Sequence, residues 1–363
     1  MRIYHLFFTL FSCFLLTLNS AFSQTKTLYV GSYTKTDSKG IYEFSFDSKT
    51  GILTNKKLSY DVENPTFLLA HPTEKVLYSI SKLNKYQKQQ SGAVTAFKIG
   101  KNGAFIKMSE QTSNGKSPCH LAYDKNTKQL FVSNYQGGTL SIHPTDASGA
   151  LKKATQIIDF NKSRTKAHTH AAKLNNDALF VADLGINSVS YYTYKNDKFE
   201  CKQRIPMKKN SGPRHLELTK NGRFIYVVNE YASSITVLER KRNKYKIQQD
   251  ISTLASTFNE RNTAADIHLS KDEKYVYASN RGENSLAIFK RDINTGLLTK
   301  IQSTSTHGEC PRNFTFDPTG NYLLIANKIS NSIAVFKVDK TNGKVLFKYS
   351  IHSPMPTCLT FFD

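Results

Sequence analysis

Several residues and patterns are missing from this sequence of 363 residues. It contains no tryptophan, which excludes a repeat family built on a Trp-Asp signature. No segment keeps a helical period of apolar residues over ten positions, so a helical protein is not expected. The Gly-x-Ser-x-Gly motif of serine hydrolases and a glycine-rich phosphate loop are also absent. Any chemistry must therefore depend on other residues.

Cysteine and acidic residues are scarce as well. Only five cysteines occur, none of them in a Cys-x-x-Cys spacing, so neither a disulfide framework nor a zinc site is expected. We expect most of them to be buried thiols. Asp and Glu number 28 against 50 Lys and Arg, which gives a net charge of +22. This excess favours anionic partners such as phosphates or carboxylates, but the basic pairs in turns are interpreted as solvated charge, and no nucleic-acid partner is expected.

Apolar residues make up 39% of the chain, enough for a sizeable core, but the longest apolar run is confined to the N-terminus. Arg2 precedes an apolar stretch at residues 6–18, and the small residues Ala21 and Ser23 permit cleavage before Gln24. Such a stretch is long enough for a signal peptide and short for a membrane span. We therefore predict a signal peptide at 1–23 and an exported mature chain, periplasmic or secreted, without a membrane span. An uncleaved anchor is the alternative.

The rest of the chain repeats itself. Each unit contains four short segments of alternating apolar and polar residues, separated by polar or glycine-containing turns, as expected for strands. The units are 45 to 53 residues apart and start at Pro65, Pro118, His168, Pro213, Ala264, Pro311 and Pro356. Four strands at this period predict the blade of a β-propeller.

The two ends of the chain determine the number of blades. The last unit, at 356–362, supplies only a first strand, whereas the mature N-terminus supplies three strands, at 27–33, 40–47 and 51–58. Pairing of the two ends completes a seventh blade and removes open sheet edges. We therefore predict an all-β fold, a single seven-bladed β-propeller with four antiparallel strands per blade, spanning residues 24–363. A two-domain or sandwich fold is the alternative.

Equivalent positions of the seven blades form rings around the central channel, and departures from the repeat within a ring mark candidate site residues. The ring in the first strands comprises Thr66, Cys119, His170, Arg214, Ala265, Arg312 and Thr357. The ring that closes the second strands comprises Tyr33, Lys82, Tyr135, Leu184, Glu230, Arg281 and Lys328. Four consecutive blades thus carry, in order, His170, Arg214 with Glu230, Arg281 and Arg312.

This set combines one imidazole, one carboxylate and three guanidiniums at one mouth of the channel. Guanidiniums bind carboxylates or phosphates bidentately, and His and Glu are common proton-transfer groups. The set predicts an anionic small-molecule site; a buried structural ion network is the alternative. His168, two positions before His170, is either a second ligand-facing group or a residue of the rim. His120, His215 and His268 are expected to point to the other face of their strands and to pack between blades.

Two stretches show a resemblance to a known family: GPRHLELTKNGRFIYVVNEYASSITV from residue 212 and AADIHLSKDEKYVYASNRGENSLAIF from residue 264. They closely resemble the seven-bladed propeller lactonase family, which includes bacterial 6-phosphogluconolactonases and the fungal carboxy-cis,cis-muconate cyclase. The resemblance extends over essentially the whole mature chain. In the cyclase branch it implies a site made of a His, an Arg, a Glu sixteen residues after that Arg, and a later Arg. The matching positions in this sequence are His170, Arg214, Glu230 and Arg281.

The resemblance implies hydrolysis of a sugar lactone of the 6-phosphogluconolactone type to the open acid. In this hypothesis Glu230 or His170 deprotonates the attacking water, while Arg214 and Arg281 hold the substrate anion and the developing oxyanion. The candidates for substrate binding are Arg312 and His168. No metal or organic cofactor is expected, and the partner is a small anionic lactone bound by a monomer. Two alternatives stay open: a muconate-type cycloisomerase that forms a lactone, and a non-catalytic exported binding propeller.

Overall fold

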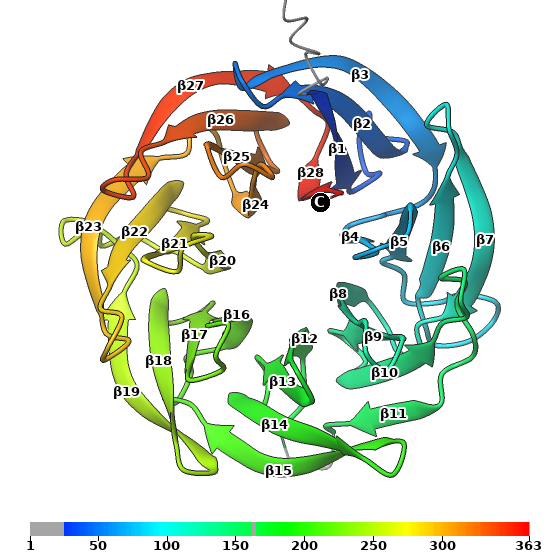
Figure 1. Ribbon diagram of the computed structural model, residues 1–363, viewed down its shortest axis with the longest axis horizontal. Helices are drawn as coiled ribbons and strands as arrows, with labels where there is room; N and C mark the ends of the chain where they lie inside the picture. The colour runs from blue at the N-terminus through cyan, green and yellow to red at the C-terminus, as the bar shows by residue number, and fades with distance from the viewer. Residues whose placement is uncertain (1–24, 162–164, 363) are drawn as a thin grey trace, which may run out of the picture.

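The computed structural model describes residues 25–161 and 165–362. The regular secondary structure in this part of the chain consists of β-strands. Seven four-stranded antiparallel sheets are arranged around a central axis as the blades of a propeller (Figure 1). The seven-bladed all-β fold is therefore confirmed. Over the same residues no helix is long and apolar enough to cross a membrane. The predicted signal peptide at 1–23 lies outside the described residues.

The strands fall into four groups by their distance from the axis (Figure 1). The innermost strands are β4 (Leu68–Ala70), β8 (Pro118–Asp124), β12 (Thr169–Asn175), β16 (Pro213–Leu218), β20 (Ala264–Leu269), β24 (Pro311–Phe316) and β28 (Pro356–Phe361). The second strands are β1 (Thr25–Ser32), β5 (Val76–Ser81), β9 (Gln129–Asn134), β13 (Ala178–Asp183), β17 (Phe224–Asn229), β21 (Tyr275–Asn280) and β25 (Tyr322–Asn327). The third strands are β2 (Gly40–Asp47), β6 (Ala93–Ile99), β10 (Thr139–Pro144), β14 (Ser188–Lys195), β18 (Ser234–Lys241), β22 (Ser285–Arg291) and β26 (Ser332–Val338). The outermost strands are β3 (Ile52–Asp61), β7 (Phe105–Thr112), β11 (Gln156–Asp159), β15 (Lys198–Pro206), β19 (Lys244–Ser252), β23 (Leu298–Ser305) and β27 (Val345–His352).

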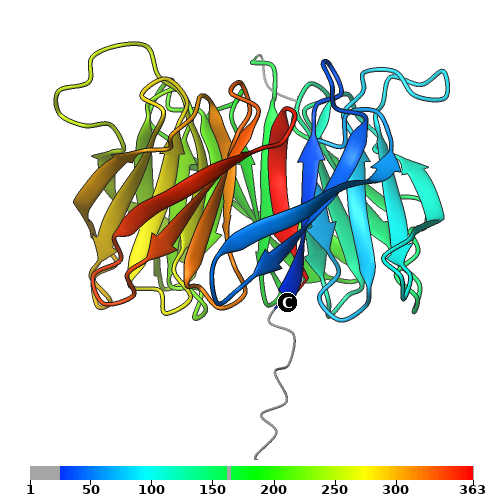
Figure 2. The ribbon, with the colours of Figure 1, turned by 90° about the horizontal axis from the view of Figure 1, so that it is seen from above.

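The seventh blade is assembled from both ends of the chain. β28 pairs antiparallel with β1, with Leu28 opposite Phe361 and Val30 opposite Leu359. The sheet continues from β1 into β2 and β3. This pairing confirms the predicted closure, and it places the start of β1 and the end of β28 at the same face of the disc, where Figure 2 shows the C-terminus.

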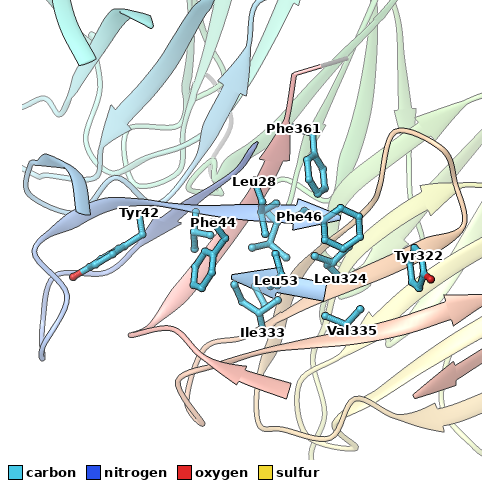
Figure 3. Close-up of a cluster of buried hydrophobic side chains, with 13 residues drawn as sticks. Leu28, Tyr42, Phe44, Phe46, Leu53, Tyr322, Leu324, Ile333, Val335 and Phe361 are labelled. Atoms are coloured by element: carbon cyan, nitrogen blue, oxygen red, sulfur yellow. The ribbon is translucent and has the colours of Figure 1, made fainter. Parts of the chain in front are cut away.

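Apolar side chains pack between neighbouring blades rather than in one central core. The described residues contain seven such clusters, each of which joins two adjacent blades. In the cluster of Figure 3, Phe44 and Phe46 of β2 pack with Tyr322 and Leu324 of β25, across the junction between the closing blade and its neighbour. Burying a Phe or Leu side chain contributes roughly 1.5–3 kcal/mol, so the alternation that puts both phenylalanines on one face stabilises the ring of blades.

The cysteines that the structure describes are free. Cys119 and Cys358 are buried, but Cys310 is half-buried and Cys201 is exposed. The expectation that most of them are buried thiols is therefore met by only two of these four residues.

Six innermost strands begin with a β-bulge. In β16, Pro213 lies opposite Asn229 and His215 lies opposite Val228, so Arg214 is an extra, unpaired residue. Similar register shifts occur at the starts of β8, β12, β20, β24 and β28. Because a bulge interrupts the alternation of side chains, two consecutive residues can face the channel.

The two ends of the channel are named here by their residues. The end where the innermost strands start is the arginine mouth, after Arg214, Arg281 and Arg312, and the other end is the opposite mouth.

Candidate active site

Glu230 connects two arginines at the arginine mouth. Its carboxylate oxygen Oε2 lies 2.9 Å from Nε of Arg214 and 3.0 Å from Nη2 of Arg281. The contact given for each arginine is made by the same oxygen, Oε2. Burial raises the pKa of Glu230, but Arg281 and Arg214 lower it more, and the net pKa lies below its ordinary value. Glu230 is therefore an ionised carboxylate at neutral pH and can accept a proton.

The hairpin of β16 and β17 brings Arg214 and Glu230 together. Gly212, which precedes β16, has a φ of 66°, a left-handed conformation that glycine adopts without strain. Its carbonyl accepts the backbone N–H of Glu230 at 2.6 Å. A Cβ atom at this position would lie only 2.7 Å from the ring of Tyr231. The glycine thus allows the start of β16 to lie against the end of β17. This explains why the Gly-Pro-Arg-His…Asn-Glu block starts with glycine.

Arg214 is held on three sides. Besides its contact with Glu230, its Nη1 donates to the backbone carbonyl of Ala265 and lies 3.3 Å from Nε2 of His215. Only 2% of the side chain is exposed. Burial and the positive charges of Arg281 and Arg312 lower the pKa of Arg214 to about 9. The guanidinium therefore keeps its charge at neutral pH while its position is fixed.

Arg281 and Arg312 continue this cationic wall over the next two blades. Nη2 of Arg281 also donates to the carbonyl of Ala264 at 2.9 Å. Arg312, from the bulge of β24, has no ion pair or side-chain hydrogen bond within residues 25–161 and 165–362. Burial lowers the pKa of Arg312, but Tyr33 and Glu230 raise it more, so the net pKa lies above its ordinary value. Arg312 is thus a protonated guanidinium able to bind an anion.

His170 and His168 lie in the neighbouring blade, in β12 and just before it. His170 is buried, its Nδ1 atom has no partner in the described part of the chain, and its ring lies 5.0 Å from that of His215. Burial and the charge of Arg214 hold the pKa of His170 well below its ordinary value, so the imidazole is neutral. His168 is half-buried, stacks on Tyr135 at 4.6 Å and contacts the Tyr135 carbonyl through Nδ1 at 2.9 Å. Both histidines thus pack against the Tyr135 ring, His168 at 4.6 Å and His170 at 5.7 Å, and His170 also lies against His215.

The expectation that His120 and His215 pack between blades is wrong. His268 does contact both adjacent blades, through Glu217 of β16 and Phe314 of β24. The ring of His215 lies 5.2 Å from that of His120 and 6.5 Å from that of Phe67, which comes from a blade that is not its neighbour. These contacts run across the channel. The bulges explain them, because they turn the residue after each first-ring position toward the axis as well. His268 lies further along β20, on the wall of a hollow of about 1260 Å³ at the opposite mouth.

Asp266 is a site residue that the sequence analysis missed. Its Oδ1 atom lies 2.6 Å from Nδ1 of His215, whose Nε2 faces Arg214. Oδ2 accepts from Nδ2 of Asn313 at 2.6 Å and contacts His268 at 3.2 Å. Burial raises the pKa of Asp266, but His268 and His215 lower it more, so the carboxylate is ionised. Asp266 thus holds His215, and His215 in turn holds Arg214. The sequence feature that could have indicated Asp266 is a polar residue at a strand position expected to be buried.

A small polar cavity lies beneath the arginine mouth. It measures about 10 Å³, roughly the room that one water molecule needs. Its lining residues are Thr66, Phe67, Lys82, Cys119, Arg214, His215, Arg312, Asn313 and Thr357. Arg214 and Arg312 therefore face one cavity from two blades that are separated by the blade of β20–β23.

The two rings at this mouth have a strong excess of positive charge. Among their residues the only carboxylate is Glu230, and the cations are Lys82, Arg214, Arg281, Arg312 and Lys328. A cleft lined mainly by one sign of charge attracts the opposite sign. Within the described residues, no three or more His, Cys, Asp or Glu side chains are arranged to hold a metal ion. The arrangement can thus bind an anion next to a carboxylate that can accept a proton.

Fold and site together define a seven-bladed propeller with a cationic channel mouth, and comparison with known proteins gives its family. The family model described as "Lactonase, 7-bladed beta-propeller" matches residues 27–361. The chain is 34% identical over 335 residues to a 6-phosphogluconolactonase of Formosa agariphila, covering 88% of this chain and 94% of the relative. It is 29% identical over 344 residues to a 6-phosphogluconolactonase of Bacillus subtilis, with 92% and 97% covered.

A solved structure agrees with these relatives. The periplasmic gluconolactonase of Pseudomonas aeruginosa has a TM-score of 0.86 and 25% identity to this chain, over 93% of this chain and 99% of the other. The chain belongs to the lactonase family of seven-bladed β-propellers. It is an enzyme, and its class is that of the lactone hydrolases.

Proposed function

We propose that this protein hydrolyses a sugar lactone of the 6-phosphogluconolactone type to the open acid at the arginine mouth. The observation that carries the proposal is the state of Glu230, an ionised carboxylate that forms ion pairs with two guanidiniums at the channel mouth. The unpaired guanidinium of Arg312 lies close enough to influence the same carboxylate. The relatives named 6-phosphogluconolactonase support the substrate class.

The proposed reaction uses Glu230 as the base. Water attacks the lactone carbonyl while the carboxylate of Glu230, which Arg214 and Arg281 hold in place, accepts its proton. The two guanidiniums stabilise the oxyanion that forms on the former carbonyl oxygen. When the ring C–O bond breaks, the proton passes from Glu230 to the leaving alkoxide, which becomes the hydroxyl of the open acid. Removing one preorganised oxyanion donor typically costs about 10²–10³ in rate.

His170 is the second candidate for the base. Its imidazole is neutral and its Nδ1 atom lacks a partner among the described residues, so it can accept a proton. However, His170 is buried, whereas 16% of the Glu230 side chain is exposed, so water reaches Glu230 more easily. Kinetics of Glu230→Gln and His170→Gln separate the two, because replacing the base lowers kcat with little change in KM.

Purified mature chain and three substrates test the proposal: 6-phosphoglucono-δ-lactone, glucono-δ-lactone and carboxy-cis,cis-muconate. A pH-stat follows acid release against the spontaneous rate, and ultraviolet absorbance follows loss of the muconate. We expect ring opening of the phosphorylated lactone above the spontaneous rate and loss of this activity in Glu230→Gln. Ring closure of the muconate without lactone opening would instead support the cycloisomerase alternative. Absence of turnover on both lactones would reject the proposed substrate class.

We also propose that the mature chain is exported to the periplasm or secreted. The signal-peptide pattern of residues 1–23 supports this, as does the neighbour of Pseudomonas aeruginosa that is described as periplasmic. N-terminal sequencing after cell fractionation should find a chain that starts at Gln24 outside the cytoplasm. An intact N-terminus in the cytoplasmic fraction would contradict export. Light scattering on the same sample should give the mass of a single chain.

A further inference from the structure

We propose that Arg312, Lys82 and Lys328, gathered around Tyr33, form a subsite for the phosphoryl group of the substrate. This inference rests on the proposed function and adds the place where the charged end of the lactone binds. The reacting carbonyl would lie at Glu230, and the phosphoryl group would lie at the adjacent blades.

The subsite is built from three consecutive blades. Arg312 and Lys328 belong to the blade of β24–β27, Tyr33 follows β1 in the closing blade, and Lys82 follows β5 in the next one. The ammonium groups of Lys82 and Lys328 each lie 5.9 Å from the centroid of the Tyr33 ring. Lys82 and Arg312 also line the cavity into which Arg214 projects. The cluster is therefore continuous with the Glu230 site.

These cations differ from the other cations of the mouth because they are unpaired. Arg214 and Arg281 share the single carboxylate of Glu230. In the part of the chain that the structure describes, Arg312, Lys82 and Lys328 form no ion pair. Burial raises the pKa of Tyr33, but Arg312, Lys82 and Lys328 lower it more, so the net pKa lies below its ordinary value. The lowered pKa of the Tyr33 phenol thus indicates a positive electrostatic potential around it, which an anionic ligand would neutralise.

The combination of one guanidinium and two ammonium groups suits a phosphoryl group. A phosphate monoester carries about −1.5 to −2 charges at neutral pH and has three acceptor oxygens. An arginine can bind two of these oxygens as a fork, while lysines act as point charges for the remaining charge. A single carboxylate would leave part of this positive charge unbalanced. The charge and its spread over three blades therefore favour the phosphorylated lactone over the unphosphorylated one.

Steady-state kinetics on two lactones test the subsite. Lys82→Gln and Lys328→Gln should each raise the KM for 6-phosphoglucono-δ-lactone about tenfold, the typical value of one charge-assisted hydrogen bond, with little change in kcat. The KM for glucono-δ-lactone should change far less in both variants. Lys340→Gln, on the wall of the opposite mouth, is the matched control and should leave both substrates unaffected. Equal effects on the two lactones, or none on the phosphorylated one, would overturn the proposal.

A binding experiment without turnover gives an independent readout. In protein labelled with ¹³C at the tyrosine ring, the signal missing from Tyr33→Phe assigns Tyr33, and its alkaline titration gives the pKa. Inorganic phosphate or 6-phosphogluconate should raise that pKa, and Lys82→Gln should reduce the increase. An unchanged titration at saturating 6-phosphogluconate would overturn the subsite.

The two experiments separate the two proposals. Wild-type protein that opens neither lactone but shows the Tyr33 response would reject the proposed function and retain the anion subsite. Protein that opens both lactones equally well, without a Tyr33 response, would retain lactone hydrolysis and reject the subsite.

Discussion

Replacing Glu230 by glutamine removes the one carboxylate of the two channel rings while keeping its shape. In the native site, Oε2 contacts Nε of Arg214 at 2.9 Å and Nη2 of Arg281 at 3.0 Å. An amide cannot balance these charges, so the two guanidiniums repel each other, with Arg312 adding to the repulsion. We expect Glu230→Gln to remain folded but to lose turnover, because the acceptor for the proton of water is gone.

The expected loss of stability follows from the burial of these groups. Two unit charges 4 Å apart interact by about 4 kcal/mol at an effective dielectric constant near 20, and breaking a buried pair typically costs roughly 3–5 kcal/mol. The side chains of Glu230 and Arg281 retain 16% and 11% exposure, so water at the mouth offsets part of this loss. Removing the buried negative charge also relieves its desolvation. We therefore expect the free energy of unfolding to fall by about 2 kcal/mol, within the usual range for one substitution.

Urea unfolding and lactone turnover are measured for Glu230→Gln, Arg281→Ala and the double variant. Because residues that act as a unit are not additive, the double variant should lose little more activity than either single one. Glu239→Gln is the matched control in the same blade: Glu239 pairs with Arg223 at 2.8 Å, but Arg223 is 48% exposed. Its loss should stay below about 1 kcal/mol, with turnover unchanged.

Two outcomes would refute this reasoning. Parental turnover in Glu230→Gln would remove Glu230 from the mechanism and leave His170 as the base. A stability loss above about 5 kcal/mol, beyond the range for most single substitutions, would show that the ion cluster of Glu230 is primarily structural.

Three further predictions concern the closure, the binding of anions and the pH dependence. Deleting residues 24–34 removes β1, the partner of β28, and should abolish cooperative unfolding; an unchanged melting transition would contradict the closure. Arg312→Ala should raise the KM for a phosphorylated or carboxylated lactone with little change in kcat, and equal losses on neutral lactones would speak against this role. The pKa of Glu230 is below 4.5 and that of His170 is well below 6.5, so both are already in the basic form at neutral pH and lose it only as pH falls through those values. With glucono-δ-lactone, which has no phosphate to titrate, and after subtraction of spontaneous hydrolysis, kcat/KM should therefore be flat between about pH 5.5 and 8, and a decrease centred near pH 6.5 would show that the base has an ordinary histidine pKa.

Much of the site could be predicted from the sequence because its main charges depend on local geometry. Arg214 and Glu230 lie at the open end of one hairpin, so their separation in the sequence already makes them neighbours once β16 and β17 pair. Arg281 occupies the position of Glu230 in the next blade, and the repeat carries this equivalence from one blade to the next. Arg312 follows from the same counting and His168 from its spacing of two residues from His170, and their roles in binding stay predictions.

The sequence by itself determined the seven blades and their closure, because strand alternation and turn spacing are local patterns and the missing strands at one end match those at the other. Only the tertiary structure decided which side chains meet inside the channel. A bulge depends on the register with the neighbouring strand, so no local period shows that His215 and Asp266 face the axis. The contact between His215 and Phe67 depends on how seven blades close into a ring. The closure sets the width of the channel and so brings together residues from blades that are not neighbours. The depressed pKa of Glu230 arises from the same convergence, since its cationic neighbours come from three blades.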